Sequence, residues 1–186
     1  LQEKLILSDE ITKDKTTFCC VRYGNVLGSR GSVIPLWDKR LEQNKPLPIT
    51  HPDMTRFVLT LHEAIDLVFY SLKFGKNGDI FVKKAPATKM VNLARAYAEL
   101  KTGKKNYPLK YIGIRAGEKI DEILVSNEEM RHVSEKKDHF VIKRESLIDK
   151  NYVTKSTKIP EYGSGTIPLL SVEELKSLMK KLQWVV

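Results

Sequence analysis

Short apolar runs alternate with amphipathic segments along this 186-residue chain, and this alternation limits the fold more than any other feature. The runs with the composition of strands are residues 17–21, 80–82 and 111–114. The segments with helical apolar spacing are residues 33–37, 61–72 and 91–100, with a further short helix expected through Ile120, Ile123 and Leu124. Residues 130–145 fit a hairpin or an extended arm. Alternation of this kind predicts an α/β fold.

The helix ends carry signals of their own. Thr60 to Glu63 and Ser171 to Glu174 each have the Ser/Thr-x-x-Glu spacing of a capping box, which predicts helices that start there. Leu1, Leu5 and Ile6 predict another helix, but no capping residue precedes it. We therefore expect the sequence to be a fragment of a longer chain.

Four aromatic residues lie on the apolar faces of the expected elements. They are Trp37, Phe57, Phe69 and Tyr70, and we expect all of them in the core. On the helix of residues 61–72, the apolar face is formed by Leu61, Ile65, Val68, Phe69 and Leu72.

The composition excludes several classes of protein. With 41% hydrophobic and 30% charged residues the chain is globular, and no apolar run approaches the roughly 18 residues of a membrane span. The net charge of +9 comes from lysines interleaved with acids, so we expect a solvated surface and no nucleic-acid partner. The adjacent Cys19 and Cys20 would point to opposite faces of a strand, which argues against a disulfide and favours the cytoplasm. The histidines show no metal-ligand spacing, and we expect no metal.

The segment RYGNVLGSRGSVIP, residues 22–35, is the candidate ligand loop. Gly28 and Gly31 allow the backbone to approach a ligand closely, and Ser32 opens a helix whose N-terminus favours anions. Asn25 offers both a hydrogen-bond donor and an acceptor. The segment matches neither a Walker loop nor G-x-G-x-x-G. From the residues alone, a tight loop without a ligand is an equally good interpretation.

Several arginines could bind an anion. Arg22 and Arg30 lie in the loop, Arg56 lies in HPDMTRF, and Arg115 lies in IGIRAGEK at the end of an expected strand. A guanidinium at the carboxyl edge of a sheet suits a phosphate, and the nearby Glu118 suits a pair of sugar hydroxyls. From spacing alone, the simpler interpretation is that Arg115 and Glu118 are surface residues that pair with other charges.

Four segments in order resemble one family. VRYGNVLGSRGSVIPLW, PITHPDMTRF, GDIFVKKAP and IGIRAGEKIDE resemble the UDP-N-acetylglucosamine 4,6-dehydratases and capsular polysaccharide epimerases, which are extended short-chain dehydrogenase/reductases. The resemblance covers residues 1–125, with a weaker match at LSVEELKSL. It departs from the family pattern at Ala116, which replaces a proline, and at KAPATK, which replaces KIPSMK.

The resemblance implies the C-terminal part of an NAD(P)-binding Rossmann-like fold with a smaller mixed α/β substrate domain. Residues 1–30 would be the last part of the Rossmann domain. Residues 31–186 would be the UDP-sugar-binding domain, with some strands returning to the Rossmann sheet. The family's catalytic Tyr-x-x-x-Lys pair does not occur in this chain and is expected upstream of Leu1, so the chain alone would be inactive.

The family pattern also implies site residues. Tyr23 would lie near the nicotinamide of NAD or NADP, and Asn25 would contact the nucleotide-sugar. Ser32 and Val33 would approach the uridine diphosphate, Arg56 and Arg115 would clamp it, and Glu118 would accept hydrogen bonds from the ribose.

The implied activity is a UDP-N-acetylglucosamine 4,6-dehydratase, which works by internal redox and loss of water. Two alternatives are a UDP-sugar C4-epimerase and, if the natural chain is this short, a non-catalytic module that binds a UDP-sugar or a partner. We also expect a homo-oligomer of undetermined order.

Overall fold

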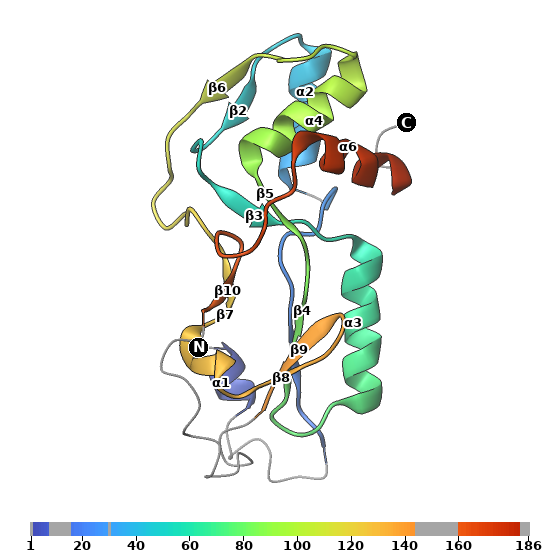
Figure 1. The fold of residues 1–186 in the computed structure, drawn as a ribbon, viewed down its shortest axis with the longest axis vertical. Helices are drawn as coiled ribbons and strands as arrows, with labels where there is room; N and C mark the ends of the chain where they lie inside the picture. Colours follow the sequence, from blue (N-terminus) through green and yellow to red (C-terminus); the bar gives the residue numbers. More distant parts are fainter. Residues whose placement is uncertain (1, 8–15, 30, 144–159, 183–186) are drawn as a thin grey trace.

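The computed structural model describes residues 2–7, 16–29, 31–143 and 160–182. These residues form an elongated molecule with a helical lobe at one end and a sheet lobe at the other (Figure 1). Two short antiparallel ladders lie between the lobes. The α/β class predicted from the sequence is confirmed, and the sheets are mixed.

The helical lobe consists of α2 (Val33–Glu42), β2 (Leu47–Ile49), α4 (Met90–Thr102), β6 (Leu109–Tyr111) and α6 (Val172–Lys181). β2 and β6 pair in parallel, and α4 packs against both α2 and α6 (Figure 1). The core between these elements contains Trp37, Leu93, Tyr97 and Leu175, all almost completely buried. The predicted helix of residues 91–100 and the capped closing helix are both confirmed.

The sheet lobe contains a four-stranded sheet in the order β1 (Cys20–Arg22), β4 (Ile80–Lys83), β9 (His139–Ile142) and β8 (Val133–Glu135). β1 and β4 are parallel, and the other pairs are antiparallel. The lobe also contains α1 (Gln2–Ile6), α3 (Leu61–Phe74) and α5 (Asn127–Met130). Strand β4 and the hairpin of β8 and β9 confirm two expectations, whereas the strand expected at residues 17–21 is regular only from Cys20. β4, β8 and β9 lie in one sheet with β1, and the domain boundary at residue 30 stays a prediction.

The two central ladders are β3 (Thr55–Phe57) with β5 (Ala87–Lys89), and β7 (Ile123–Val125) with β10 (Tyr162–Gly163). Phe57, Tyr162 and Phe140 stack beside them, with ring centroids 5.1 and 5.0 Å apart. The central ladders thus share one apolar core with the sheet lobe.

The helix expected through Ile120, Ile123 and Leu124 is wrong, because residues 123–125 form β7. The carbonyl of Ile120 accepts a hydrogen bond from Thr55, at 3.0 Å, and the carbonyl of Glu122 accepts one from Ser164, at 2.7 Å. Both partners are far away in the sequence. Tertiary pairing therefore overrides the local helical spacing here.

The strand expected at residues 111–114 is also largely wrong. β6 ends at Tyr111, and Gly113 adopts a left-handed conformation with φ of 84°. Ile112 and Ile114 are exposed. A left-handed glycine does not fit a pleated strand, so the chain leaves the ladder before Arg115.

Helix α3 begins where predicted, with the complete Thr60–Glu63 capping box, but it buries an unexpected face. Its buried residues are Ala64, Leu67 and Ser71, which pack toward β1 and β4. Phe69 is 66% exposed and Tyr70 is 37% exposed, so their expected place in the core is wrong, whereas Trp37 and Phe57 are fully buried as predicted.

Candidate functional site

The glycine-rich loop begins by packing tightly against β3. A Cβ atom on Gly24 would lie 2.4 Å from the Cβ of Phe57, so only glycine permits this approach. The next residues run beside the chain that follows β3. The Asn25 carbonyl accepts from Leu59 at 3.2 Å, and the Leu27 N–H donates to the Leu59 carbonyl at 2.9 Å. These bonds fix the backbone from which the Asn25 side chain projects.

The loop then delivers Ser32 to the start of α2. Gly28 and Gly31 have φ of 72° and 79°, a region that glycine occupies without strain. Ser32 is the N-cap residue, yet its side chain makes no cap hydrogen bond. Its Oγ is buried and has no hydrogen-bond partner among the described residues. A buried hydroxyl at a helix N-terminus is therefore free to bind a ligand.

Two adjoining cavities open at this helix end. The first, of about 390 Å³, is lined by Asn25, Ser32, Val33, Arg56 and Glu118, together with apolar residues such as Trp37 and Met90. The second, of about 730 Å³, shares Ser32, Val33 and Glu118 and adds Arg115. The structure thus brings all six residues predicted to bind substrate to this pair of adjoining cavities, together called the hollow.

Arg115 and Glu118 face each other across a tight turn at the edge of the hollow. The Arg115 N–H donates to Glu118 Oε2 at 3.2 Å, and the Glu118 N–H donates to the Arg115 carbonyl at 3.0 Å. Gly117, with φ of 80°, permits the turn. Arg115 is exposed, and its guanidinium forms no ion pair within the described part of the chain. It can therefore bind an anion without breaking a contact.

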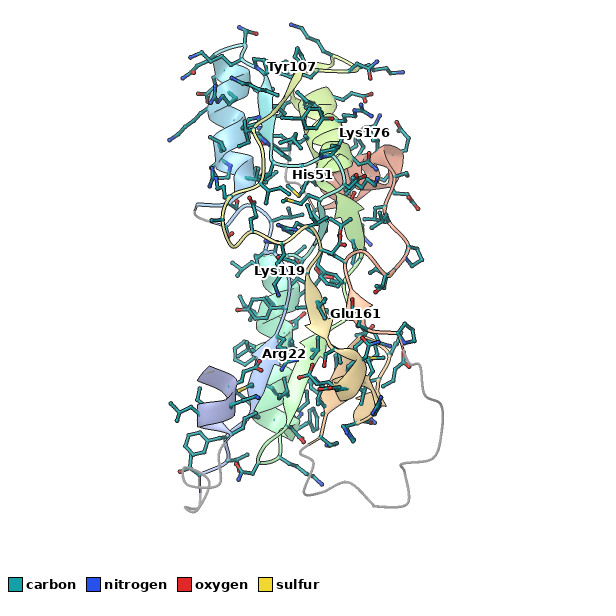
Figure 2. All side chains as sticks on the ribbon, turned by 90° about the vertical axis from the view of Figure 1, so that its left-hand side faces the viewer. Arg22, His51, Tyr107, Lys119, Glu161 and Lys176 are labelled. Carbon is teal, nitrogen blue, oxygen red and sulfur yellow. The ribbon has the colours of Figure 1, made fainter. Side chains whose placement is uncertain are left out.

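Arg56 is held more firmly. Its Nη1 donates to the carbonyls of Thr55 and Ile120 at 2.6 and 2.9 Å, and its Nη2 donates to the carbonyl of Lys119 at 2.8 Å. Lys119 lies near the middle of the molecule, between the lobes (Figure 2). These bonds join β3 to residues 119–120 and leave the guanidinium few free donors. The diphosphate clamp assigned to Arg56 by resemblance stays a prediction.

Glu122 lies beside the site residue Asn25, a contact that the sequence did not reveal. Its side chain is 29% exposed and lies 3.6 Å from Arg56 Nε. With its amide nitrogen turned to the carboxylate, Asn25 donates to both Glu122 oxygens, at 2.9 and 3.1 Å. Burial raises the pKa of Glu122, and the Arg56 charge opposes this effect. The sequence predicted a short helix through Ile120, Ile123 and Leu124, so no sequence signal placed Glu122 beside Asn25.

Arg22 lies outside the hollow, in the sheet lobe (Figure 2). Its guanidinium binds Glu3 and Glu129 and also donates to the Leu124 carbonyl at 3.0 Å. Glu129 closes a capping box with Ser126, whose S-x-x-E spacing is present in the sequence. Arg22 therefore ties α1 and α5 to β1, while Arg30 lies outside the described residues.

The remaining candidates are peripheral. Tyr23 follows β1 directly, is 42% exposed and lines neither cavity. His51 accepts a hydrogen bond from the Asp53 N–H at 3.2 Å, as expected of a loop residue. Within residues 2–7, 16–29, 31–143 and 160–182, no cluster of three His, Cys, Asp or Glu side chains could hold a metal ion.

None of the helices in the described part of the chain has both the length and the apolar composition needed to cross a bilayer.

A family model described as polysaccharide biosynthesis protein matches residues 1–144. This chain belongs to that family. The family membership predicted from the four sequence segments is thereby confirmed.

Curated relatives and a solved structure agree with the family. The chain is 40% identical to the UDP-glucose 4-epimerases of Rickettsia bellii (strain OSU 85-389) and Rickettsia felis over its whole length. It spans 56% of each relative, about half of their length. The X-ray structure of Pen from Bacillus thuringiensis superposes with a TM-score of 0.84 at 34% identity, covering 99% of this chain and 55% of that one.

Proposed function

We propose that this chain is the UDP-sugar-binding part of a nucleotide-sugar C4-epimerase. The proposal rests on one observation, the meeting of Ser32, Arg115 and Glu118 at the N-terminus of α2. The identity of 40% to UDP-glucose 4-epimerases favours the epimerase over the dehydratase that the sequence segments put first.

In this proposal the diphosphate lies at the end of α2. The Ser32 hydroxyl, which has no partner among the described residues, and the first backbone N–H groups of the helix donate to it, and the helix dipole favours its charge. The free guanidinium of Arg115 binds it from the edge of the hollow. Glu118, fixed by the turn, accepts hydrogen bonds from the ribose. Val33, in the first turn of α2, approaches the diphosphate beside Ser32.

The binding of UDP would serve reaction at the distant sugar. Anchoring the nucleotide holds the sugar in one orientation, which is how remote binding energy contributes to catalysis. A nicotinamide cofactor, NAD or NADP, would supply the hydride chemistry at C4 of the sugar. Tyr23, exposed at the carboxyl end of β1, would lie near such a cofactor, as the family pattern implies. The catalytic Tyr-x-x-x-Lys pair would belong to the part of the relatives that this chain does not span.

Product analysis tests the activity. The full-length protein, incubated with UDP-glucose and NAD, is expected to form UDP-galactose, which NMR identifies by the inverted C4. Formation of a 4-keto-6-deoxy sugar from UDP-N-acetylglucosamine would instead support the dehydratase. Binding without turnover of either substrate would support a non-catalytic module. Size-exclusion chromatography with light scattering checks the expected homo-oligomer.

Substitution of Arg115 tests the site. Arg115→Ala should weaken UDP binding by about 1.5–3 kcal/mol, because a charge-assisted hydrogen bond is lost. Lys110→Ala removes the same charge from an exposed residue of β6 that lines neither cavity, and it serves as the control. Equal UDP affinities in calorimetry for wild type and Arg115→Ala would remove Arg115 from the site.

A further inference from the structure

Glu122 is fixed from several directions beside the first cavity. Its N–H donates to Ser164 Oγ at 2.9 Å, and its carbonyl accepts from the Ser164 N–H at 2.7 Å. Its carboxylate lies 3.6 Å from Arg56 Nε. A side chain held in this way can impose an orientation on its neighbours.

The neighbour that lines the cavity is Asn25. A carboxylate only accepts hydrogen bonds, so the amide nitrogen of Asn25 must face it, at 2.9 and 3.1 Å from the two oxygens. The amide oxygen then points away from Glu122. Because the Asn25 backbone is fixed to Leu59, the side chain cannot easily turn as a whole.

We propose that Glu122 is a positioning residue, which makes Asn25 a hydrogen-bond acceptor for a hydroxyl of the sugar in a UDP-sugar. This inference rests on the proposed function of the hollow. It also gives the orientation of the UDP-sugar: the sugar lies against Asn25, and the diphosphate lies against Ser32 and Arg115.

The chemistry of the Asn25–Glu122 pair disfavours the reverse arrangement, in which the diphosphate would lie against Asn25. An amide oxygen accepts from a hydroxyl or an N–H, but it cannot donate to an unprotonated phosphate. The carboxylate behind it is already paired with Arg56, at 3.6 Å, and itself offers a phosphate no hydrogen-bond donor. A sugar hydroxyl suits both features, and its binding should therefore depend on the Asn25–Glu122 pair while that of the diphosphate should not.

The test compares UDP-glucose with UDP in calorimetry on the full-length protein. Glu122→Gln offers an amide to Asn25, which frees the Asn25 side chain to turn around. We expect the affinity for UDP-glucose to fall about 5-fold to 10-fold, the scale of one hydrogen bond, with the affinity for UDP changed less than about twofold. Asn25→Asp should show the same selective loss, because two carboxylates then face each other.

The double variant Asn25→Asp/Glu122→Gln separates positioning from a structural role. In this variant the new glutamine amide can donate to one oxygen of the new aspartate, which leaves the other oxygen to accept from the sugar, and the total charge equals that of wild type. We expect recovery of the UDP-glucose affinity to within about threefold of wild type. Glu128→Gln, at an exposed residue of α5, is the matched control, and thermal unfolding checks that each variant is folded.

The outcomes are distinguishable. Three results would overturn the inference while UDP binding stands. They are equal losses of UDP and UDP-glucose affinity in Glu122→Gln, no loss of either affinity, and a double variant whose loss of affinity is the product of the two single losses. Failure of the wild-type protein to bind either UDP or UDP-glucose would overturn the proposed function itself, and this inference with it.

Discussion

Helices α3 and α4 have almost the same length, 14 and 13 residues, but very different surroundings. α4 packs against α2, α6 and β2, and it buries Val91, Leu93, Tyr97 and three alanines. α3 packs on one side only, against β1 and β4, so that Leu61, Phe69 and Leu72 are 62%, 66% and 73% exposed. The two helices start from the same kind of apolar spacing. An apolar pattern thus identifies a helical face without identifying what covers it.

The largest expected difference in stability is between alanine variants of two aromatic residues, one in each lobe. Trp37 is fully buried in the helical lobe, 6.1 Å from the Tyr97 ring, whereas Phe69 on α3 is 66% exposed. Trp37→Ala should lower the free energy of unfolding of the 186-residue chain by about 3–5 kcal/mol, because it leaves a cavity. Phe69→Ala should cost less than about 1 kcal/mol.

Urea denaturation followed by circular dichroism measures both variants. Similar losses for Trp37→Ala and Phe69→Ala would contradict the contrast between the lobes. Repeating Phe69→Ala in the full-length protein sharpens the comparison, since a larger cost there would mean that further chain covers α3.

The same contrast explains how far the sequence could predict the fold. The helix starts at Thr60 and Ser171 were predictable because a capping box is a local signal within four residues. The exposure of Phe69, the strand at Ile123 and the end of β6 before Arg115 depend on contacts far away in the sequence. Local spacing cannot contain that information.

The candidate site likewise has residues that the sequence could predict and a contact that it could not. Ser32, Arg115 and Glu118 were predicted from family segments, and the structure brings them to one hollow. The contact between Asn25 and Glu122, far apart in the sequence, arises from the packing of Gly24 on Phe57 and from the Ser164 bonds. Only the tertiary structure reveals it.

A second prediction concerns the Tyr97 hydroxyl in the helical lobe. Tyr97 donates to Asp38 Oδ1 at 2.5 Å, and burial together with this bond raises the pKa of Tyr97. Tyr97→Phe should cost about 1 kcal/mol at neutral pH, the value of one hydrogen bond. In wild type, the unfolded chain releases this proton near pH 10 while the folded chain retains it, so stability should fall as pH rises above about 10.

Tyr97→Phe should remove that alkaline component, as urea midpoints between about pH 8 and 11 would show. Tyr111→Phe is the control, because Tyr111 is 53% exposed on β6. An unchanged alkaline slope in Tyr97→Phe would mean that Tyr97 does not keep its proton in the folded chain.

The smallest expected effect on stability concerns His139 in the sheet lobe, where stability is lost as pH falls and not as it rises. His139 is buried, 4.4 Å from the Tyr70 ring, and its Nε2 has no partner among the described residues. Burial and the nearby Lys83 lower the pKa of His139. Its contribution to stability is therefore present above about pH 6.5, where the unfolded histidine is neutral, and is lost as pH falls through the folded pKa.

His139→Phe should flatten the acid side of the stability profile, whereas His62→Gln, at a side chain that is 86% exposed, should leave it unchanged. If His139→Phe retains the full acid dependence in urea titrations from about pH 4.5 to 8, other groups carry it, and the acid sensitivity does not belong to the core of the sheet lobe.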